Sequence, residues 1–259
     1  MQAYDKMSKT ELLEEQKVLN DKLSEFKALN LKLNMARGKP GKEQLALSMP
    51  MLDVLNSKSD FLAENGADCR NYGELTGIAD AKKMFSEYMG VSEKEIIVVG
   101  SSSLTFMYDT MARAMLKGVL GSQKPWGKNE KVKFICPVPG YDRHFTICEF
   151  LDIEMIPVPL NEWGPDMDMI EELIKDDSVK GMWCVPKYSN PLGGVFSDEA
   201  VKRLAKIKPA APDFRIFWDN AYAVHKVYKD IPVLNILDEC KKAGNPNMPF
   251  LFGSTSKIT

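Results

Sequence analysis

Apolar runs typical of strands alternate with amphipathic runs typical of helices between residues 95 and 252, and this alternation constrains the fold most strongly. The two patterns alternate five times, which favours a mostly parallel sheet with helices on both faces. We therefore predict an α/β protein. The expected strands lie at residues 95–99, 131–136, 153–157, 179–185, 214–219 and 250–252.

The first 48 residues lack this alternation. Ser8 to about Leu33 has the apolar spacing of an amphipathic helix, and a loop rich in Gly and Pro follows. We assign residues 1–48 to a segment of a smaller second domain and residues 49–259 to a large domain that is incomplete at its C-terminus. The chain ends two residues after Lys257, so we expect it to be the front part of a longer polypeptide.

Composition excludes several classes of function. The net charge is −2, which gives no electrostatic case for binding nucleic acid or an anionic membrane. No apolar run approaches the roughly 18 residues of a membrane span, and Met1–Lys9 lacks the apolar core of a signal peptide. Five scattered cysteines predict free thiols in the cytoplasm, and two histidines disfavour a metal site.

Chemistry is expected just after the strands, because the carboxyl ends of parallel strands form the ligand edge of such a sheet. Gly100–Ser103 could cradle a phosphate at a helix N-terminus, or could simply cap the next helix. Lys257 lies in a small-residue turn with Ser254 and Ser256. A lysine held there can add to an aldehyde, although a solvated loop lysine is the alternative.

Three more positions after strands suit a flat heterocycle. Tyr141 could stack on a ring, and Asn190 could donate to a phenolic oxygen. Asp219 ends a very apolar strand and needs a partner such as a protonated ring nitrogen, while Tyr222 could share the phenolic oxygen. The alternatives are a packed tyrosine, a plain turn and a helix cap. Together these positions match the chemical groups of pyridoxal 5′-phosphate (PLP).

These segments resemble PLP-dependent aminotransferases of fold type I, the aspartate aminotransferase superfamily. The resemblance covers essentially the whole chain, and Arg37-Gly-Lys-Pro40 is similar to the bacterial type Ic or MocR-like subgroup. The matching motifs are Tyr72-x-x-x-x-Gly77, Gly100–Ser103, Pro137-x-Pro-Gly-Tyr141, Asn190-Pro-x-Gly193, Asp219-x-Ala-Tyr222 and Ser254-x-Ser-Lys257.

The resemblance implies a role for each matched residue. Lys257 would form the Schiff base with PLP and shuttle the substrate proton, and Asp219 would keep the pyridine nitrogen protonated. Tyr222 and Asn190 would bond the ring 3′-oxygen, and Tyr141 would stack on the ring. The cofactor phosphate would be held by Ser101, Ser102, Ser103 and Ser254, and Ser256 would be a further cofactor-binding residue.

Two further residues bear on partners and substrate. Tyr72 would reach the cofactor phosphate of a neighbouring subunit, which implies a homodimer with shared active sites. Gly38 and Asn190 would lie near the substrate. The family also uses a phosphate-binding arginine shortly after the lysine and a carboxylate-binding arginine far downstream. Neither position lies within these 259 residues, so the amino-acid specificity stays open.

The resemblance implies a transaminase that moves an amino group between an amino acid, aspartate or glutamate, and a 2-oxo acid, 2-oxoglutarate or oxaloacetate, by a ping-pong mechanism. A PLP-dependent β C–S lyase would share every residue above. A non-catalytic effector domain of a transcription regulator is the remaining alternative. Only 36 residues precede Arg37, which is too few for a DNA-reading domain.

Overall fold

The computed structural model describes residues 3–32 and 41–258. The chain divides into two compact units, Met1–Asn56 and Ser57–Thr259, and each is described by itself. Among the described residues, no helix has both the length and the apolar character that crossing a bilayer requires.

The first unit consists of helical segments. α1 (Lys9–Ala28) begins at a capping box, since the Ser8 hydroxyl accepts from the Glu11 amide at 3.3 Å. None of the side chains of α1 is buried. The other segments are α2 (Lys42–Ala46) and the 3₁₀ turns η1 (Tyr4–Lys6) and η2 (Met49–Asp53). The assignment of residues 1–48 to a smaller second domain stays a prediction.

The second unit is built on a six-stranded sheet in the described part of the chain. The order of the strands is β3-β2-β1-β4-β5-β6, and every pairing is parallel except that of β3 with β2. The predicted α/β class is confirmed. The strands are β1 (Lys133–Val138), β2 (Glu154–Asn161), β3 (Gly164–Pro165), β4 (Val179–Cys184), β5 (Arg215–Asp219) and β6 (Pro249–Phe252).

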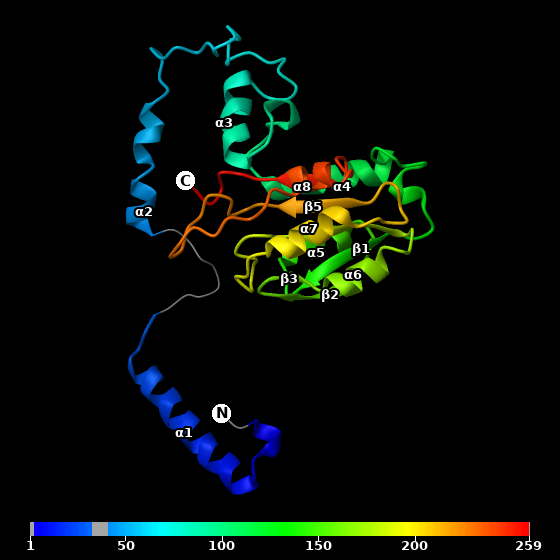
Figure 1. Cartoon of the computed structure of the whole chain (residues 1–259). Helices are drawn as coiled ribbons and strands as arrows, with labels where there is room; N and C mark the ends of the chain where they lie inside the picture. The colour runs from blue at the N-terminus through cyan, green and yellow to red at the C-terminus, as the bar shows by residue number, and fades with distance from the viewer. Residues whose placement is uncertain (1–2, 33–40, 259) are drawn as a thin grey trace. The chain divides into compact units, whose positions relative to one another are not determined.

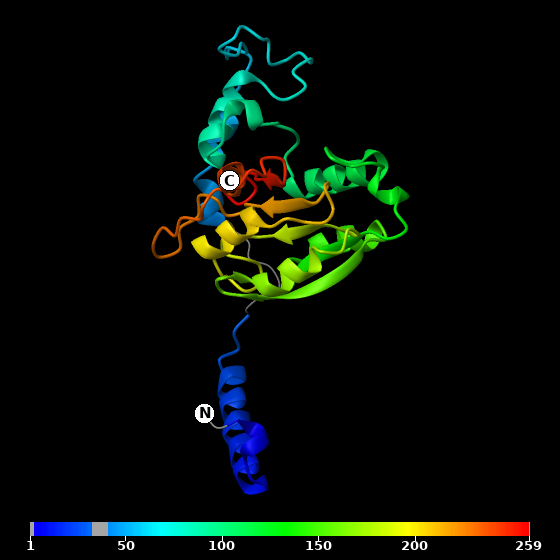
Figure 2. The same ribbon diagram turned by 45° about the vertical axis from the view of Figure 1, so that its right-hand side comes forward.

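Helices connect the strands and lie against the sheet (Figures 1 and 2). Side-chain caps begin several of them, as at Ser102, Asp166 and Ser197, because these oxygens satisfy free amides of the first turn. The helices are α3 (Ala79–Met89), α4 (Ser103–Lys117), α5 (Asp142–Phe150), α6 (Met167–Leu173), α7 (Asp198–Lys206) and α8 (Ile236–Lys242), with the 3₁₀ turns η3 (Glu93–Glu95) and η4 (Trp126–Lys128).

Two hydrophobic cores lie on opposite faces of the sheet. In β5, Ile216 and Trp218 enter one core and Phe217 enters the other, as the two-residue period of a strand requires. The first core is closed by α6, α7 and α8, and the second by α4 and α5. Both faces of the central strands are therefore buried, which explains their continuous apolar sequence.

The strand predicted at residues 95–99 is wrong. Ile96 is extended, but it and the next three residues belong to no strand. The Ile96 amide donates to the Glu93 carbonyl at 3.3 Å and the Val98 amide to the Thr76 carbonyl at 3.0 Å. Ile97 and Val99 are 57% and 47% exposed. An apolar segment of high β propensity forms a strand only when a neighbouring backbone is available to pair with it.

A buried polar cluster lies where β4 and β5 begin, opposite the ligand edge. The Asp213 carboxylate accepts from Lys180 Nζ at 2.9 Å, from Ser122 Oγ at 2.7 Å and from Trp126 Nε1 at 3.0 Å. Burial alone would raise the pKa of the Asp213 carboxyl. The hydrogen bonds and the charge of Lys180 outweigh that effect and hold the pKa below its usual value.

Replacing Asp213 with Ala should lower the free energy of unfolding by about 3–5 kcal/mol, because Lys180 would remain buried without its partner. The contribution of Asp213 should be complete above about pH 4 and fade as the pH falls through the lowered native pKa. Urea unfolding at several pH values measures both effects. Asp109→Ala, which removes an exposed pair with Arg113, is the control and should cost under about 1 kcal/mol. Equal costs would contradict the prediction.

Candidate functional site

The turn that carries Lys257 follows β6 and is tied to two distant segments. Tyr88 Oη, from α3, donates to the Ser254 carbonyl at 3.0 Å. Ser256 Oγ donates to the Ser101 carbonyl at 3.3 Å and accepts from Ser254 Oγ at 3.0 Å. The structure thus brings Ser101, Ser254, Ser256 and Lys257 into one cluster, and the Lys257 side chain is exposed at its surface.

Tyr222 and His225, in the segment after β5, lie against the same turn. Lys257 Nζ is 5.9 Å from the centroid of the Tyr222 ring. The His225 ring meets the Tyr222 ring edge-on at 5.4 Å, and His225 Nε2 lies 3.0 Å from the Lys257 carbonyl oxygen. The predicted pair of Tyr222 and Lys257 is therefore brought together.

Asp219 is buried at the end of β5 and is 4% exposed. Its Oδ2 lies 3.1 Å from His144 Nε2, and the His144 ring stacks on Trp183 at 4.4 Å. The other carboxylate oxygen, Oδ1, is buried and has no hydrogen-bond partner among the described residues. A buried oxygen without a donor is costly, so this atom marks a place for a donor from outside the described chain.

His144 is a site residue that the sequence reasoning missed. The structure buries it between Asp219, Trp183 and Tyr141 and places its Nε2 against the Asp219 carboxylate. Tyr141 meets the His144 ring edge-on at 5.1 Å. The spacing of three residues at the start of α5 was the available signal, because it places the two side chains on one side of the helix.

The Tyr222 hydroxyl remains protonated at neutral pH. Burial raises its pKa, and the negative charge of Asp219 and the nearby Tyr141 raise it further. The pKa of Tyr88 is raised in the same way, by burial and then by Asp219. Both hydroxyls therefore keep a proton that they can donate, and Tyr88 donates its own to the Ser254 carbonyl in the lysine turn.

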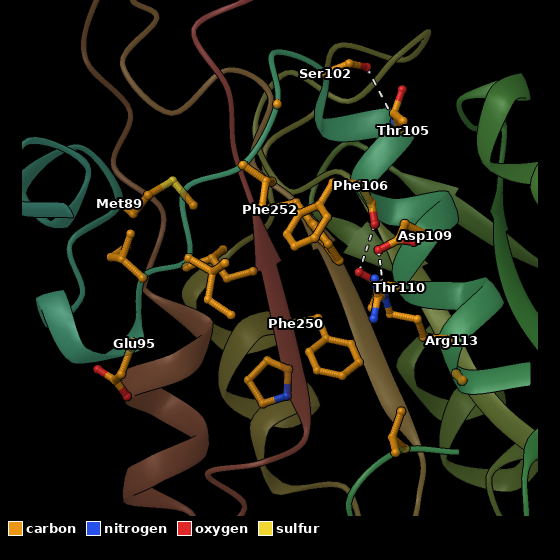
Figure 3. Close-up of a pocket in the computed structure, with 18 of the residues that line it drawn as sticks. Met89, Glu95, Ser102, Thr105, Phe106, Asp109, Thr110, Arg113, Phe250 and Phe252 are labelled. Atoms are coloured by element: carbon orange, nitrogen blue, oxygen red, sulfur yellow. Dashed lines mark hydrogen bonds and ion pairs between the residues drawn. The ribbon is translucent and has the colours of Figure 1, made fainter. Parts of the chain in front are cut away.

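The predicted phosphate cradle lies at the start of α4 (Figure 3). Ser102 caps the helix, since its hydroxyl accepts from the Thr105 amide at 3.4 Å, and Ser103 is the first helical residue. Ser101 and Ser102 are exposed, and Ser101 contacts the lysine turn through its carbonyl. Ser102 thus has the plain capping role. The hydroxyl of Ser101 and the other amides of the first turn lie at the N-terminus of a 15-residue helix, where an anion is favoured.

A large apolar cavity of about 1060 Å³ lies between β6, α4 and residues 95–102 (Figure 3). Phe106, Phe250 and Phe252 line it, as do Ser101 and Ser102. Lys257, Asp219 and Tyr222 are not among its lining residues. This cavity therefore reaches the predicted phosphate cradle but not the predicted lysine, acid or tyrosine.

The structure does not bring the remaining predicted residues into the cluster around Lys257. Asn190 is exposed, precedes Pro191 across a cis peptide bond, and lines a small cavity of about 20 Å³ with Tyr141 and His144. Tyr72 is 98% exposed, and no side chain of the cluster contacts it. Gly38 lies outside the described residues.

Comparison with known proteins places the chain in a family. The sequence model described as aspartate amino-transferase matches residues 7–259. The chain belongs to the aspartate aminotransferase family. The resemblance stated from the sequence motifs is confirmed.

Individual proteins that this aspartate aminotransferase family member resembles support the same family. Aspartate aminotransferase of Corynebacterium glutamicum is 49% identical over 239 residues, which are 92% of this chain and 55% of that protein. A crystal structure of an aspartate transaminase from Corynebacterium glutamicum superposes with a TM-score of 0.91 at 46% identity, covering 98% of this chain and 60% of that one. A kynurenine aminotransferase of Pyrococcus horikoshii shares the fold, with a TM-score of 0.64 at 19% identity over 100% of this chain and 59% of that one.

Lys187 is a buried lysine beside the site, and sequence reasoning did not single it out. Its Nζ donates to the Ala223 carbonyl at 3.2 Å and lies 3.5 Å from Asp230 Oδ1. It also lies 5.6 Å from the centroid of the Tyr188 ring. The side chain thus joins the loop that carries Asn190 to the segment that carries Tyr222.

Replacing Lys187 with Met in this aspartate aminotransferase family member should cost about 1.5–3 kcal/mol, because a buried charged hydrogen bond is lost and the Ala223 carbonyl keeps no donor. Amide exchange in residues 186–194 and 221–230 should become faster than elsewhere. Hydrogen exchange with thermal unfolding measures both. Lys229→Met, at an exposed position of the same segment, is the matched control. Unchanged exchange in both segments would show that Lys187 does not join them.

Proposed function

We propose that the polypeptide containing this chain is a PLP-dependent aminotransferase. The observation that carries the proposal is the buried Asp219 Oδ1, which has no partner among the described residues and lies at the sheet edge from which Lys257 also emerges. A carboxylate oxygen left in this way is suited to a protonated ring nitrogen. The chain spans 55% and 61% of the lengths of two curated relatives, so the activity of the whole protein is part of this proposal.

The residues fit the cofactor on several sides. Asp219 offers the acceptor for a ring N–H, and Tyr222 offers a protonated hydroxyl. The serines at the start of α4 and in the lysine turn offer hydroxyl and amide donors for a phosphate, which a helix N-terminus also favours. The fold neighbour from Pyrococcus horikoshii is described in complex with PMP, which supports the same cofactor class.

Bound PLP would supply an aldehyde that condenses with amines and a ring that takes up the electron pair of a bond broken at the amino-acid α-carbon. Lys257 Nζ would hold the aldehyde carbon and carry the proton to and from the substrate. Its exposed side chain, on a turn tied to Tyr88 and Ser101, suits that movement. Tyr141 would cover one face of the ring.

His144 would act near the ring nitrogen, through Asp219, and Tyr222 would act at the ring 3′-oxygen. His144 occupies Asp219 Oδ2 and is held by stacking on Trp183, so Asp219 keeps one orientation. The raised pKa of Tyr222 keeps its hydroxyl a donor, which with the Asn190 amide would bond the ring 3′-oxygen. Ser101, Ser102, Ser103, Ser254 and Ser256 would hold the phosphate.

We further propose aspartate or glutamate with 2-oxoglutarate or oxaloacetate as substrates in a ping-pong exchange. The support is the name of the Corynebacterium glutamicum relative and the family membership. A homodimer with shared sites would give the exposed Tyr72 its partner, the phosphate bound to the other subunit. Gly38 would lie near the substrate. The cytoplasmic location remains a prediction.

Lys257→Ala should abolish covalent trapping of PLP by borohydride in the natural polypeptide that contains this chain, because the reducible bond forms at Lys257 Nζ. The wild-type protein should be yellow and should retain the label after denaturation. Mass spectrometry of peptides locates the label. Lys226→Ala, an exposed lysine in the segment after Tyr222, is the control and should label normally. A labelled Lys257→Ala variant would place the bond elsewhere.

Addition of aspartate or glutamate without a 2-oxo acid should convert about one equivalent of bound PLP to pyridoxamine phosphate, since a transaminase stops after the first half-reaction. Absorbance and chromatography of the released cofactor measure this. Release of pyruvate and ammonia from a sulfur amino acid, without pyridoxamine phosphate, would favour the β C–S lyase instead. If the protein binds PLP but carries out neither reaction, that result would favour the non-catalytic alternative.

A further inference from the structure

We propose that His225 is a positioning residue that fixes the backbone of Lys257, an inference that rests on the proposed role of Lys257. His225 Nε2 lies 3.0 Å from the Lys257 carbonyl oxygen. A carbonyl oxygen only accepts, so Nε2 must carry the proton and donate. This hydrogen bond joins two segments that are 32 residues apart in the sequence.

The imidazole itself is held in place. The His225 amide donates to the Tyr222 carbonyl at 3.1 Å, and the two rings meet at 84°. Its Nδ1 is buried and has no hydrogen-bond partner among the described residues. Nδ1 therefore does not draw the ring toward another group, and the recorded polar contact of the side chain is the one to Lys257.

The other ties of the turn act at different residues. Tyr88 holds the Ser254 carbonyl, and Ser256 Oγ reaches the Ser101 carbonyl. Among the recorded hydrogen bonds of the described residues, His225 supplies the donor to the carbonyl of the lysine itself. It also contacts the Tyr222 ring, which lies 5.9 Å from Lys257 Nζ. One side chain thus contacts both the backbone of the lysine and the ring of the tyrosine.

Placement of this kind matters because a displacement of about 1 Å in a reacting group can cost about 10²-fold in rate. Without the His225 donor, the Lys257 carbonyl loses this hydrogen bond, and the turn keeps its recorded ties to distant segments at Ser254 and Ser256. The Lys257 amine then samples more positions. We expect the reaction of Lys257 with an aldehyde to slow, while Tyr222 and Asp219 keep their own contacts.

Three substitutions of His225 separate the hydrogen bond from the bulk of the ring. His225→Phe keeps an edge contact with Tyr222 and removes the donor. His225→Gln places an amide nitrogen near the position of Nε2, whereas His225→Asn is one carbon too short to reach. Tyr228→Phe, at a fully exposed position three residues on, is the matched control.

The measurements use the natural polypeptide that contains this chain. In the protein stripped of PLP, amide exchange of residues 255–258 should rise about 10-fold in the Phe and Asn variants, the loss of roughly one hydrogen bond. The rate at which added PLP becomes trappable by borohydride should fall about 10- to 100-fold in the same two variants. In the His225→Gln and Tyr228→Phe variants, both the exchange rate and the trapping rate should stay within about 3-fold of the wild-type values.

Two results would overturn the inference: exchange and trapping in the Phe and Asn variants like the wild type, or a Gln variant as impaired as Asn. If Phe fails to fold, the comparison of Gln with Asn still decides. A wild-type protein that never traps PLP would refute the proposed function instead, and the exchange measurement would still test the hydrogen bond from His225 to Lys257.

Discussion

Parallel pairing among β1, β4, β5 and β6 places the carboxyl ends of these strands along one edge of the sheet. Asp219 ends β5, and the lysine turn follows its neighbour β6. Both faces of these strands are buried in separate cores, so the strands cannot tilt or exchange faces without exposing apolar side chains. The sheet thereby holds side chains from distant parts of the sequence within contact of one another.

Much of this arrangement could be read from the sequence. Runs such as Ile216–Trp218 are apolar on every residue because both faces are covered, and a helix pattern follows most of the predicted strands. The period alone predicts a parallel sheet and hence which residues share its edge. That reasoning singled out Ser101, Ser254, Ser256, Tyr222 and Lys257, which the structure brings together. The roles of these residues stay predictions.

The rest depends on contacts that local patterns do not encode. Residues 96–99 have the composition of a strand but pair with none, because strand formation needs a neighbouring backbone as well as propensity. His144, Lys187 and His225 look ordinary in the sequence, and their importance comes from partners 75, 36 and 32 residues away. Single polar residues with long-range partners leave no periodic signal, so they are the residues most easily overlooked.

The aromatic packing under β6 also has a bearing on the lysine. Phe217 stacks on Phe252 at 5.6 Å and meets Phe250 edge-on at 5.5 Å, while Asp219 lies opposite Phe252 in the strand register. A slip of one residue would advance the lysine by about 3.3 Å and turn Leu251 and Phe252 toward the wrong faces. The packing of these three phenyl rings thus fixes the strand register, and the register in turn determines how far apart the Asp219 carboxylate and the Lys257 amine can lie.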